Sequence, residues 1–560
     1  MDSVISGFLI FFPFASPIVA GPSSAAWQLL GAWSCIALLL LSGAAVPSRA
    51  LICWLASTAA LIAIAAGDHH ALQLTAVAAV LMTGFAACVG AATVGDTRKS
   101  SSLAWGVLAA GCLSAVFGLF QYYGAAKLLF PWTSAPEIGQ AYGNLRQRNQ
   151  FATLISMALV AALWLHGHLS GRSGRMRAAL LPAAVLLTLA AAASTSRTGL
   201  LQWLSISIVA AFIAWRERRP AAADRGRGYA HRLPHPLLAL ALIPAYFLAA
   251  WALPQLAGAT VEGMLLRLRD GAPEGHSRLL LWRNVLDLIA AHPWRGWGWG
   301  ELSFAHYSFP YQGERFVELL DNAHNLPLQL AVELGVPAAL LICGGFAWLV
   351  LAARPWRERD PLRLMAWGML GAIVLHSLLE YPLWYGPFQL VFGVCLGVLW
   401  PGRRRTRNPK TADNVAPRGA AWYQVAALLL VIAIGYAGWD YTRISRLYMS
   451  PQERPAAGRQ PGPDTTLDDA HASWLYMRYV RFAELVSTPV DRDNAAHVHD
   501  LAQRSLHFSP EPRVIGKLID SASLLGEEQE ASAQSALFKR AYPEEYAAWL
   551  AARPAGARSN

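Results

Sequence analysis

The stretch ALQLTAVAAVLMTGFAACVGAAT, residues 71–93, decides the class of this fold. It carries no charged side chain, and a helix of this length rises far enough to cross the ~30 Å hydrocarbon core of a bilayer. Comparable apolar stretches recur along the chain. Hydrophobic residues make up 55% of the sequence and charged residues 14%, which is more apolar than a soluble chain of this length can bury. The sequence therefore predicts an all-α, polytopic membrane bundle.

About thirteen transmembrane helices are predicted from these stretches. The first is interpreted as a retained helix because it lacks a positive n-region and another apolar run follows it directly. The thirteen segments lie near residues 4–20, 25–46, 50–66, 71–93, 101–123, 150–166, 178–193, 198–215, 236–253, 326–352, 364–380, 384–400 and 421–439.

The distribution of Lys and Arg predicts the orientation of the bundle. Alternate loops hold most of these residues, including the runs at 216–232 and 403–418, whereas the opposite short loops hold few. Basic loops stay in the cytoplasm, so we expect the N-terminus inside and everything after Asp440 outside. The net charge of +11 then reflects membrane anchoring, and no nucleic-acid partner is expected.

Two domains are predicted on this basis. Residues 1–440 form the membrane bundle, including a large external loop at 254–325, and residues 441–560 form an external helical tail. Apolar residues in the tail recur at three and four positions, as in the antiparallel helix pairs of tetratricopeptide-like repeats. His497 and His499 stand two residues apart and would face different sides of a helix, so no metal site is expected from that pair.

The segment LLDNAHNLPLQLAVELG, residues 319–335, contains the most informative polar residues. It places His324 at the junction between the long external loop and an apolar helix, with Asp321 and Asn325 beside it. A polar cluster at the mouth of a membrane helix indicates a functional site. His324 is either a catalyst or an interfacial residue.

A second polar cluster begins the sixth predicted helix. Its residues are Arg146, Arg148, Asn149 and Gln150, on a face that should carry little positive charge. Arginines there either anchor the helix at the interface or bind an anionic ligand.

Two further arginine sites are predicted on the same face. Arg197 lies in the short turn STSRTGL, where it either snorkels or meets a negative charge. Arg278 and Arg283 begin an amphipathic helix outside the membrane, and we expect Arg278 to face His324.

This combination suits the chemistry of a lipid diphosphate bound to a sugar. Arginine forks bind diphosphate oxygens and stabilise the charge that develops on a departing diphosphate. A neutral imidazole can take the proton of an acceptor hydroxyl. Glycosyl transfer by such residues needs no metal and no cofactor.

The stretches NLRQRNQFA, STSRTGLL, SRLLLWRNVL, HPWRGWGWG and DNAHNLPLQLAVELG together resemble the O-antigen ligase/polymerase superfamily, and especially the bacterial protein O-oligosaccharyltransferases of the PglL type. The resemblance spans roughly residues 140–400. It implies a multi-pass inner-membrane glycosyltransferase whose active site faces the periplasm. Such an enzyme transfers a glycan en bloc from an undecaprenyl-diphosphate lipid to Ser/Thr hydroxyls of exported proteins, pilins among them.

The resemblance also implies roles for individual residues. Arg197 and Arg278 would bind the diphosphate, and His324 would activate the acceptor hydroxyl. The substrate-binding residues would be Arg146, Arg148, Asn149, Gln150, Arg283, Asp321 and Asn325.

Other functions remain open at this point. An O-antigen ligase would perform the same chemistry on a lipid A-core sugar, and a glycan polymerase is a related alternative. A proton-coupled transporter would use His324, Glu333 and Glu380 as a proton path. The segment HSLLEYPLWY, residues 376–385, places Glu380 at the external end of its helix, and no role is assigned to it.

Overall fold

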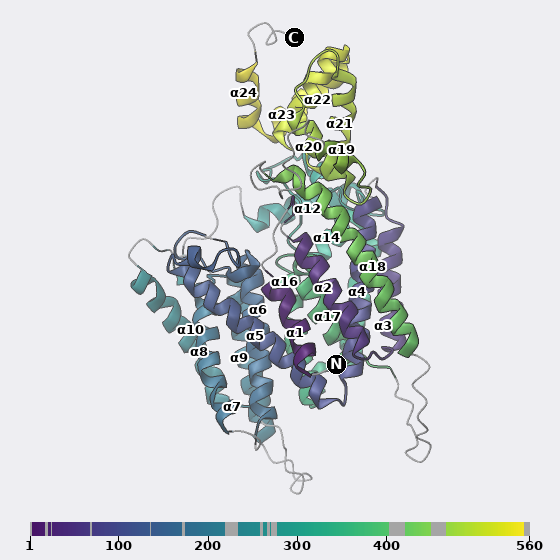
Figure 1. Ribbon diagram of the computed structural model, residues 1–560. Coiled ribbons are helices and arrows are strands. Elements are labelled where there is room, and N and C mark those ends of the chain that lie inside the picture. The colour runs from purple at the N-terminus through teal and green to yellow at the C-terminus, as the bar shows by residue number, and fades with distance from the viewer. Residues whose placement is uncertain are drawn as a thin grey trace.

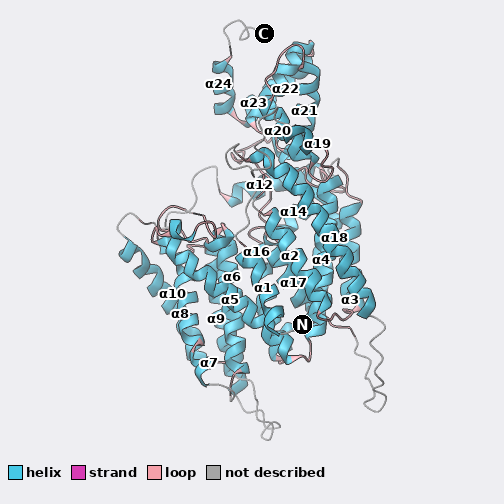
Figure 2. Cartoon of the chain, viewed as in Figure 1, coloured by secondary structure: helices cyan, strands magenta, loops and turns pink. Residues whose placement is uncertain are grey.

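Figure 1 shows a computed structural model of the chain. It describes residues 3–16, 21–23, 25–67, 70–134, 136–170, 174–218, 233–257, 261, 263–265, 269, 277–402, 420–449 and 466–553. Within these ranges every named element is a helix, apart from one isolated bridge between Pro47 and Pro401 (Figure 2). The predicted all-α class is therefore confirmed.

Each of the thirteen predicted segments contains a helix. The bundle is built from α1 (Ser3–Ala15), α2 (Ala26–Leu41), α3 (Arg49–Ala63), α4 (His70–Thr93), α5 (Thr97–Tyr122), α6 (Arg148–His168), α7 (Gly174–Ala178), α8 (Leu180–Ala193), α9 (Arg197–Arg218), α10 (Pro236–Ala257), α14 (Leu326–Leu334), α15 (Val336–Ala353), α16 (Pro361–Ser377), α17 (Gly386–Leu399) and α18 (Ala420–Ser445).

Eight helical spans among the described residues are long and apolar enough to cross a membrane, and four shorter apolar helices accompany them. The chain is thus a multi-pass membrane protein. The number of crossings and the orientation remain predictions.

The single helix predicted at 326–352 is wrong, because the chain breaks at Gly335 between α14 and α15. Gly335 has a φ of +85°, and a side chain there would lie 2.4 Å from the carbonyl oxygen of Trp294. The Trp- and Gly-rich turn at 294–300 packs against this break, and the backbone N–H of Trp297 donates to the carbonyl of Val332 at 2.8 Å. Glu333 accepts a hydrogen bond from the backbone of Gly300 at 3.0 Å, so it braces the same turn.

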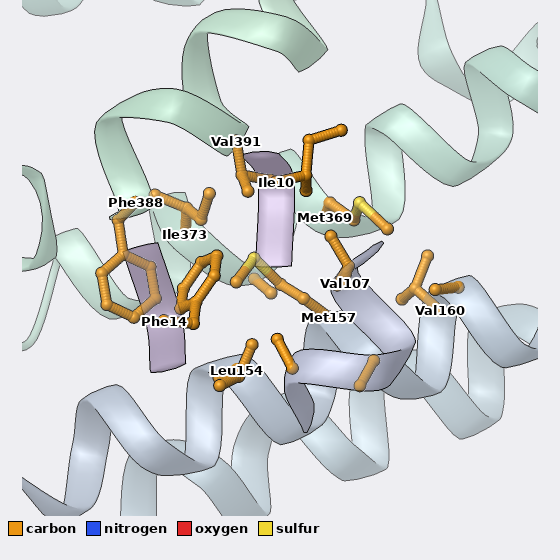
Figure 3. Packing of buried hydrophobic residues seen from close by; sticks show 14 of the residues in the cluster. Ile10, Phe14, Val107, Leu154, Met157, Val160, Met369, Ile373, Phe388 and Val391 are labelled. Atoms are coloured by element: carbon orange, nitrogen blue, oxygen red, sulfur yellow. The ribbon is translucent and has the colours of Figure 1, made fainter. Parts of the chain in front are cut away.

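The bundle core is formed by helices that lie near the beginning and near the end of the membrane region in the sequence. Figure 3 shows side chains of α1, α5, α6, α16 and α17 packed together, with the rings of Phe14 and Phe388 meeting edge to face at 5.6 Å. Helices α4 and α17 approach especially closely, since a side chain at Gly397 would lie 1.9 Å from the carbonyl oxygen of Ala87. Small residues permit this backbone contact, as is common between membrane helices.

The described parts of the segment between α10 and α14, and of the tail after α18, are also helical. The loop contains α12 (Arg278–Ala291) and α13 (Leu302–Ser308). The tail contains α19 (Thr466–His471), α20 (Met477–Ser487), α21 (Ala495–Phe508), α22 (Pro512–Leu525), α23 (Glu528–Ala541) and α24 (Pro543–Ala552). These tail helices lie beyond one end of the bundle (Figure 1).

The tail helices pack on α13, which precedes the loop that leads to His324. The Tyr307 hydroxyl donates to Gln534 at 3.0 Å, and Phe304 stacks on His507 with ring centroids 3.9 Å apart. Glu301 pairs with His507 at 2.9 Å. The contact ties the tail to the same loop that carries the candidate catalytic residue.

Candidate functional site

Glu380 is the centre of the polar cluster that contains His324. It follows the last residue of α16 and is buried, with 6% of its surface exposed. Its Oε2 lies 2.8 Å from His324 Nδ1, whereas its Oε1 accepts hydrogen bonds from Arg278 and, at 3.0 Å, from Asn149. One carboxylate thus joins three of the predicted site residues, from three separate parts of the chain.

The loop around His324 holds its ring in place. His324 has a φ of +49°, and its backbone N–H donates to Asn322 Oδ1 at 2.8 Å. Asn325 caps α14 by accepting from the Leu328 N–H at 3.1 Å, and its amide donates to the Leu378 carbonyl at 3.0 Å. A non-glycine residue held at positive φ often marks a functional site.

Protonation at this site follows from the hydrogen bonds. Burial raises the pKa of the Glu380 carboxyl, but its hydrogen bond to His324 and the charges of His324 and Arg278 outweigh burial and hold the pKa below its usual range. An ionised carboxylate only accepts hydrogen bonds, so His324 Nδ1 is the donor. In the neutral ring the free lone pair then lies on Nε2, which is the basic atom.

The residue before Arg197 is hydrogen-bonded to the cluster. Arg197 is exposed and is the first residue of α9. The hydroxyl of Ser196 donates to Asn149 Oδ1 at 2.6 Å, and Ser196 Oγ accepts from the backbone of Gly199 at 2.9 Å. Because Asn149 also binds Glu380, this chain of hydrogen bonds connects the start of α9 to the cluster.

The residues around the start of α6 lie next to this cluster. Arg146 is half-buried, and burial lowers its pKa. Its Nε and the Oε1 of Gln150 are buried, and neither has a hydrogen-bond partner among the described residues. Arg148 lies over the ring of Tyr142, 5.7 Å from the centroid. Buried polar atoms without a partner are uncommon in native structures.

Two further predicted residues differ in their relation to Glu380. Arg283 is exposed, and its guanidinium lies near Gly313. Asp321 makes no hydrogen bond to Glu380, but it is close enough for the charges of His324 and Glu380 to act on its carboxyl, whose pKa is raised mainly by burial. It also lines a cavity together with Ser377 and Leu378.

The sequence reasoning left the role of Glu380 open, and it missed the polar layer beneath. Thr153 Oγ1 lies 2.9 Å from His376 Nδ1 and accepts from Gln202 Nε2 at 2.9 Å. All three residues are buried. Glu380 carried a usable signal, namely a carboxylate at the end of an apolar helix. Thr153 and Gln202 carried none, because isolated polar residues are frequent in helices.

Two cavities lie in the bundle, and one of them adjoins the cluster. A groove of about 520 Å³ lies between α6, α9 and α16 and extends from Gln202 and Ala372 to Glu217 and Trp356, at the C-terminal end of α9. A second cavity of about 560 Å³ lies on the His324 side; Asp321 and Leu326 line it, as do Arg478 and Phe508 of the tail. The lining of both cavities is mostly apolar.

Comparisons with known proteins agree with this arrangement. Family models match three parts of the chain: residues 141–166 match "Protein glycosylation ligase", 182–343 match "O-Antigen ligase", and 364–555 match "Virulence factor membrane-bound polymerase, C-terminal". The first covers Asn149, the second covers Arg278 and His324, and the third covers Glu380.

The predicted resemblance is confirmed. The chain is similar to the O-antigen ligases and protein glycosylation ligases. It is also 28% identical over 369 residues to a General O-oligosaccharyltransferase of Acinetobacter baylyi, a match that covers 63% of this chain. The match spans 59% of the length of that relative.

Proposed function

We propose that this protein transfers a glycan en bloc from an undecaprenyl-diphosphate lipid to Ser/Thr hydroxyls of exported proteins at the periplasmic face of the bacterial inner membrane. The observation that carries the proposal is the Glu380 carboxylate, which holds His324 on one oxygen and Arg278 with Asn149 on the other. A base and a cation are thereby fixed on the two sides of one buried group.

The arrangement supports a metal-free displacement. His324 Nε2 takes the proton of the acceptor hydroxyl as the oxygen bonds to the anomeric carbon of the glycan. The bond between that carbon and the diphosphate oxygen breaks, and the electron pair leaves with the lipid diphosphate. Arg278 and Arg197 stabilise the charge on this leaving group.

The groove between α9 and α16 is the proposed site for the start of the prenyl tail. It runs along α9 from Glu217 to Gln202, five residues from Arg197 at the start of the helix. A prenyl tail in this groove would extend toward the end of α9 at which Arg197 lies. The apolar lining suits a hydrocarbon chain.

The cavity on the His324 side is the proposed approach for the acceptor. It is lined by Asp321 next to the catalytic loop and by Arg478 and Phe508 of the tail. The tail therefore helps form the surface that a pilin-like acceptor contacts. This is consistent with its packing on α13.

Mass spectrometry of periplasmic proteins and lipopolysaccharide, from cells with and without this chain, tests the proposal. We expect glycan on Ser or Thr of exported proteins only when the chain is present. Purified chain with a lipid-diphosphate glycan and a peptide should reproduce the transfer. Glycan found on lipid A-core and not on protein would instead support a ligase acting on lipopolysaccharide, which the O-antigen ligase match at 182–343 makes the second candidate.

A further inference from the structure

A separate histidine–glutamate cluster lies in the tail. His499 of α21 points toward Glu527 and Glu530, which stand at the start of α23. His499 Nε2 lies 3.3 Å from an oxygen of each glutamate. One imidazole is therefore shared between two carboxylates, far from the cluster around Glu380 in the sequence and outside the proposed chemistry.

Hydrogen bonds orient the groups of this cluster. His499 is buried, with 8% of its surface exposed, and its Nδ1 lies 3.4 Å from Ser521 Oγ. The Ser521 hydroxyl donates to the Leu518 carbonyl at 3.1 Å, so its oxygen is available to accept from Nδ1–H. In that tautomer the lone pair of a neutral ring points from Nε2 toward the glutamates. Gln503 donates to the other oxygen of Glu530 at 3.1 Å and fixes the second carboxylate.

The separations differ from those of other histidine–glutamate pairs in this chain. His497 lies 2.8 Å from Glu484 and His507 lies 2.9 Å from Glu301, as expected for direct hydrogen bonds. The two 3.3 Å separations at His499 are longer and equal. Ligands at about 2.0–2.1 Å from a tetrahedral zinc ion lie about 3.3–3.4 Å apart.

We propose that His499, Glu527 and Glu530 bind a divalent transition-metal ion of the zinc type. The three ligand atoms lie within 4.8 Å of one another, and the outer hydrogen bonds from Ser521 and Gln503 match those that usually orient metal ligands. An imidazole ligand favours Zn²⁺ over Ca²⁺ or Mg²⁺, which prefer oxygen ligands alone.

The ion would join α21 to α23 and stabilise the tail helices. Both helices contact α13, so the metal would also stabilise the tail surface that adjoins the catalytic loop. The role is structural because the cluster lies in the tail and makes no contact with the residues around Glu380. Binding would couple the folded state to metal concentration.

The test uses the full-length protein in detergent, stripped of metal with EDTA and then titrated with Zn²⁺. We expect stoichiometric binding in a chelator competition and a saturable rise in melting temperature. His499→Gln and Glu530→Gln should lose both effects, whereas the matched variant His497→Gln should retain them. Ser521→Ala, which removes only the outer hydrogen bond, should weaken binding about 10- to 100-fold.

Two results would overturn the proposal. One is equal Zn²⁺ binding by the wild type and His499→Gln, and the other is no binding by the wild type at micromolar Zn²⁺. If His499→Gln fails to fold, Ser521→Ala and Glu530→Gln still decide the question. Glycan transfer to a short peptide by the wild type is measured in the same samples, and its absence would count against the proposed function and not against the metal site.

Discussion

Two histidine–glutamate clusters in this protein have opposite stoichiometry. Around Glu380 one carboxylate accepts hydrogen bonds from a histidine and an arginine. Around His499 one imidazole lies between two carboxylates. The first cluster gathers hydrogen-bond donors around one carboxylate, whereas in the second two carboxylates face one imidazole, which suits a cation. We therefore expect the same residue types to bind different ligands in the two clusters.

The largest expected effect is on the transfer rate, which should fall when His324 is replaced but not when the tail residue His497 is replaced. His324→Ala should reduce transfer to a peptide by about 10²- to 10⁴-fold, because it removes the general base. The measurement is the initial rate with a purified lipid-diphosphate glycan. His497→Ala, which changes an exposed imidazole of the tail, is the control and should keep the wild-type rate. Near-normal transfer by folded His324→Ala would refute the base role.

The proposed binding of the diphosphate by Arg278 and Arg197 is tested by replacing each arginine with lysine, which keeps the charge. Arg278→Lys and Arg197→Lys should each lower kcat/KM by about tenfold or more, because each loses a charge-assisted hydrogen bond worth about 1.5–3 kcal/mol. Arg216→Lys, at the opposite end of α9, should be silent. Similar rates for all three variants in an in vitro transfer assay would exclude a diphosphate site at this face.

Glu380 should act as a positioning residue. Glu380→Gln removes its charge but not its shape, and we expect kcat to fall about 10- to 100-fold with little change in KM. The lowered pKa of Glu380 also predicts a pH effect. Its stabilising contribution is complete above the unfolded-state pKa and is lost as the pH falls through the lower folded-state pKa. The wild type should therefore lose stability at acid pH more steeply than Glu380→Gln; parallel melting curves across pH would contradict this.

The lipid groove gives a smaller effect that depends on the donor. Gly371 lines the groove, and a Cβ added there would meet no atom within 4 Å. Gly371→Leu should raise KM for an undecaprenyl donor by about tenfold, as expected from displacing two methylene groups. A donor with a short prenyl chain should be affected less. Gly435→Leu in α18, where the space is also open, is the matched control.

Metal removal should distinguish the two clusters without affecting the chemistry. We expect EDTA to leave transfer to a short peptide unchanged, because the proposed displacement uses only His324 and arginines. The same treatment should lower the melting temperature of the tail helices if the His499 cluster holds a metal. Loss of peptide transfer that is restored only by Mg²⁺ or Mn²⁺ would contradict the metal-free mechanism.

Local patterns in the sequence were enough for the membrane-helix class and for the polar residues on one face. Long apolar stretches such as residues 71–93 can hardly form anything but membrane helices, and His324, Arg197 and Arg278 are conspicuous beside them. Arg278 was expected to face His324, and the structure shows both bound to Glu380. These inferences depend on neighbours in the sequence.

The break at Gly335 and the two clusters were decided by tertiary structure. The apolar pattern predicts one helix over 326–352. The helix breaks at Gly335 because the turn at 294–300 packs against that residue. Glu380 gains its role from partners more than 50 residues away, Arg278 and Asn149 among them. The pattern HVHD correctly separated His497 from His499, but it could not show that Glu527 and Glu530 would meet His499. Local sequence patterns determine where apolar helices form and which positions are polar. Contacts between distant segments depend instead on how those helices pack.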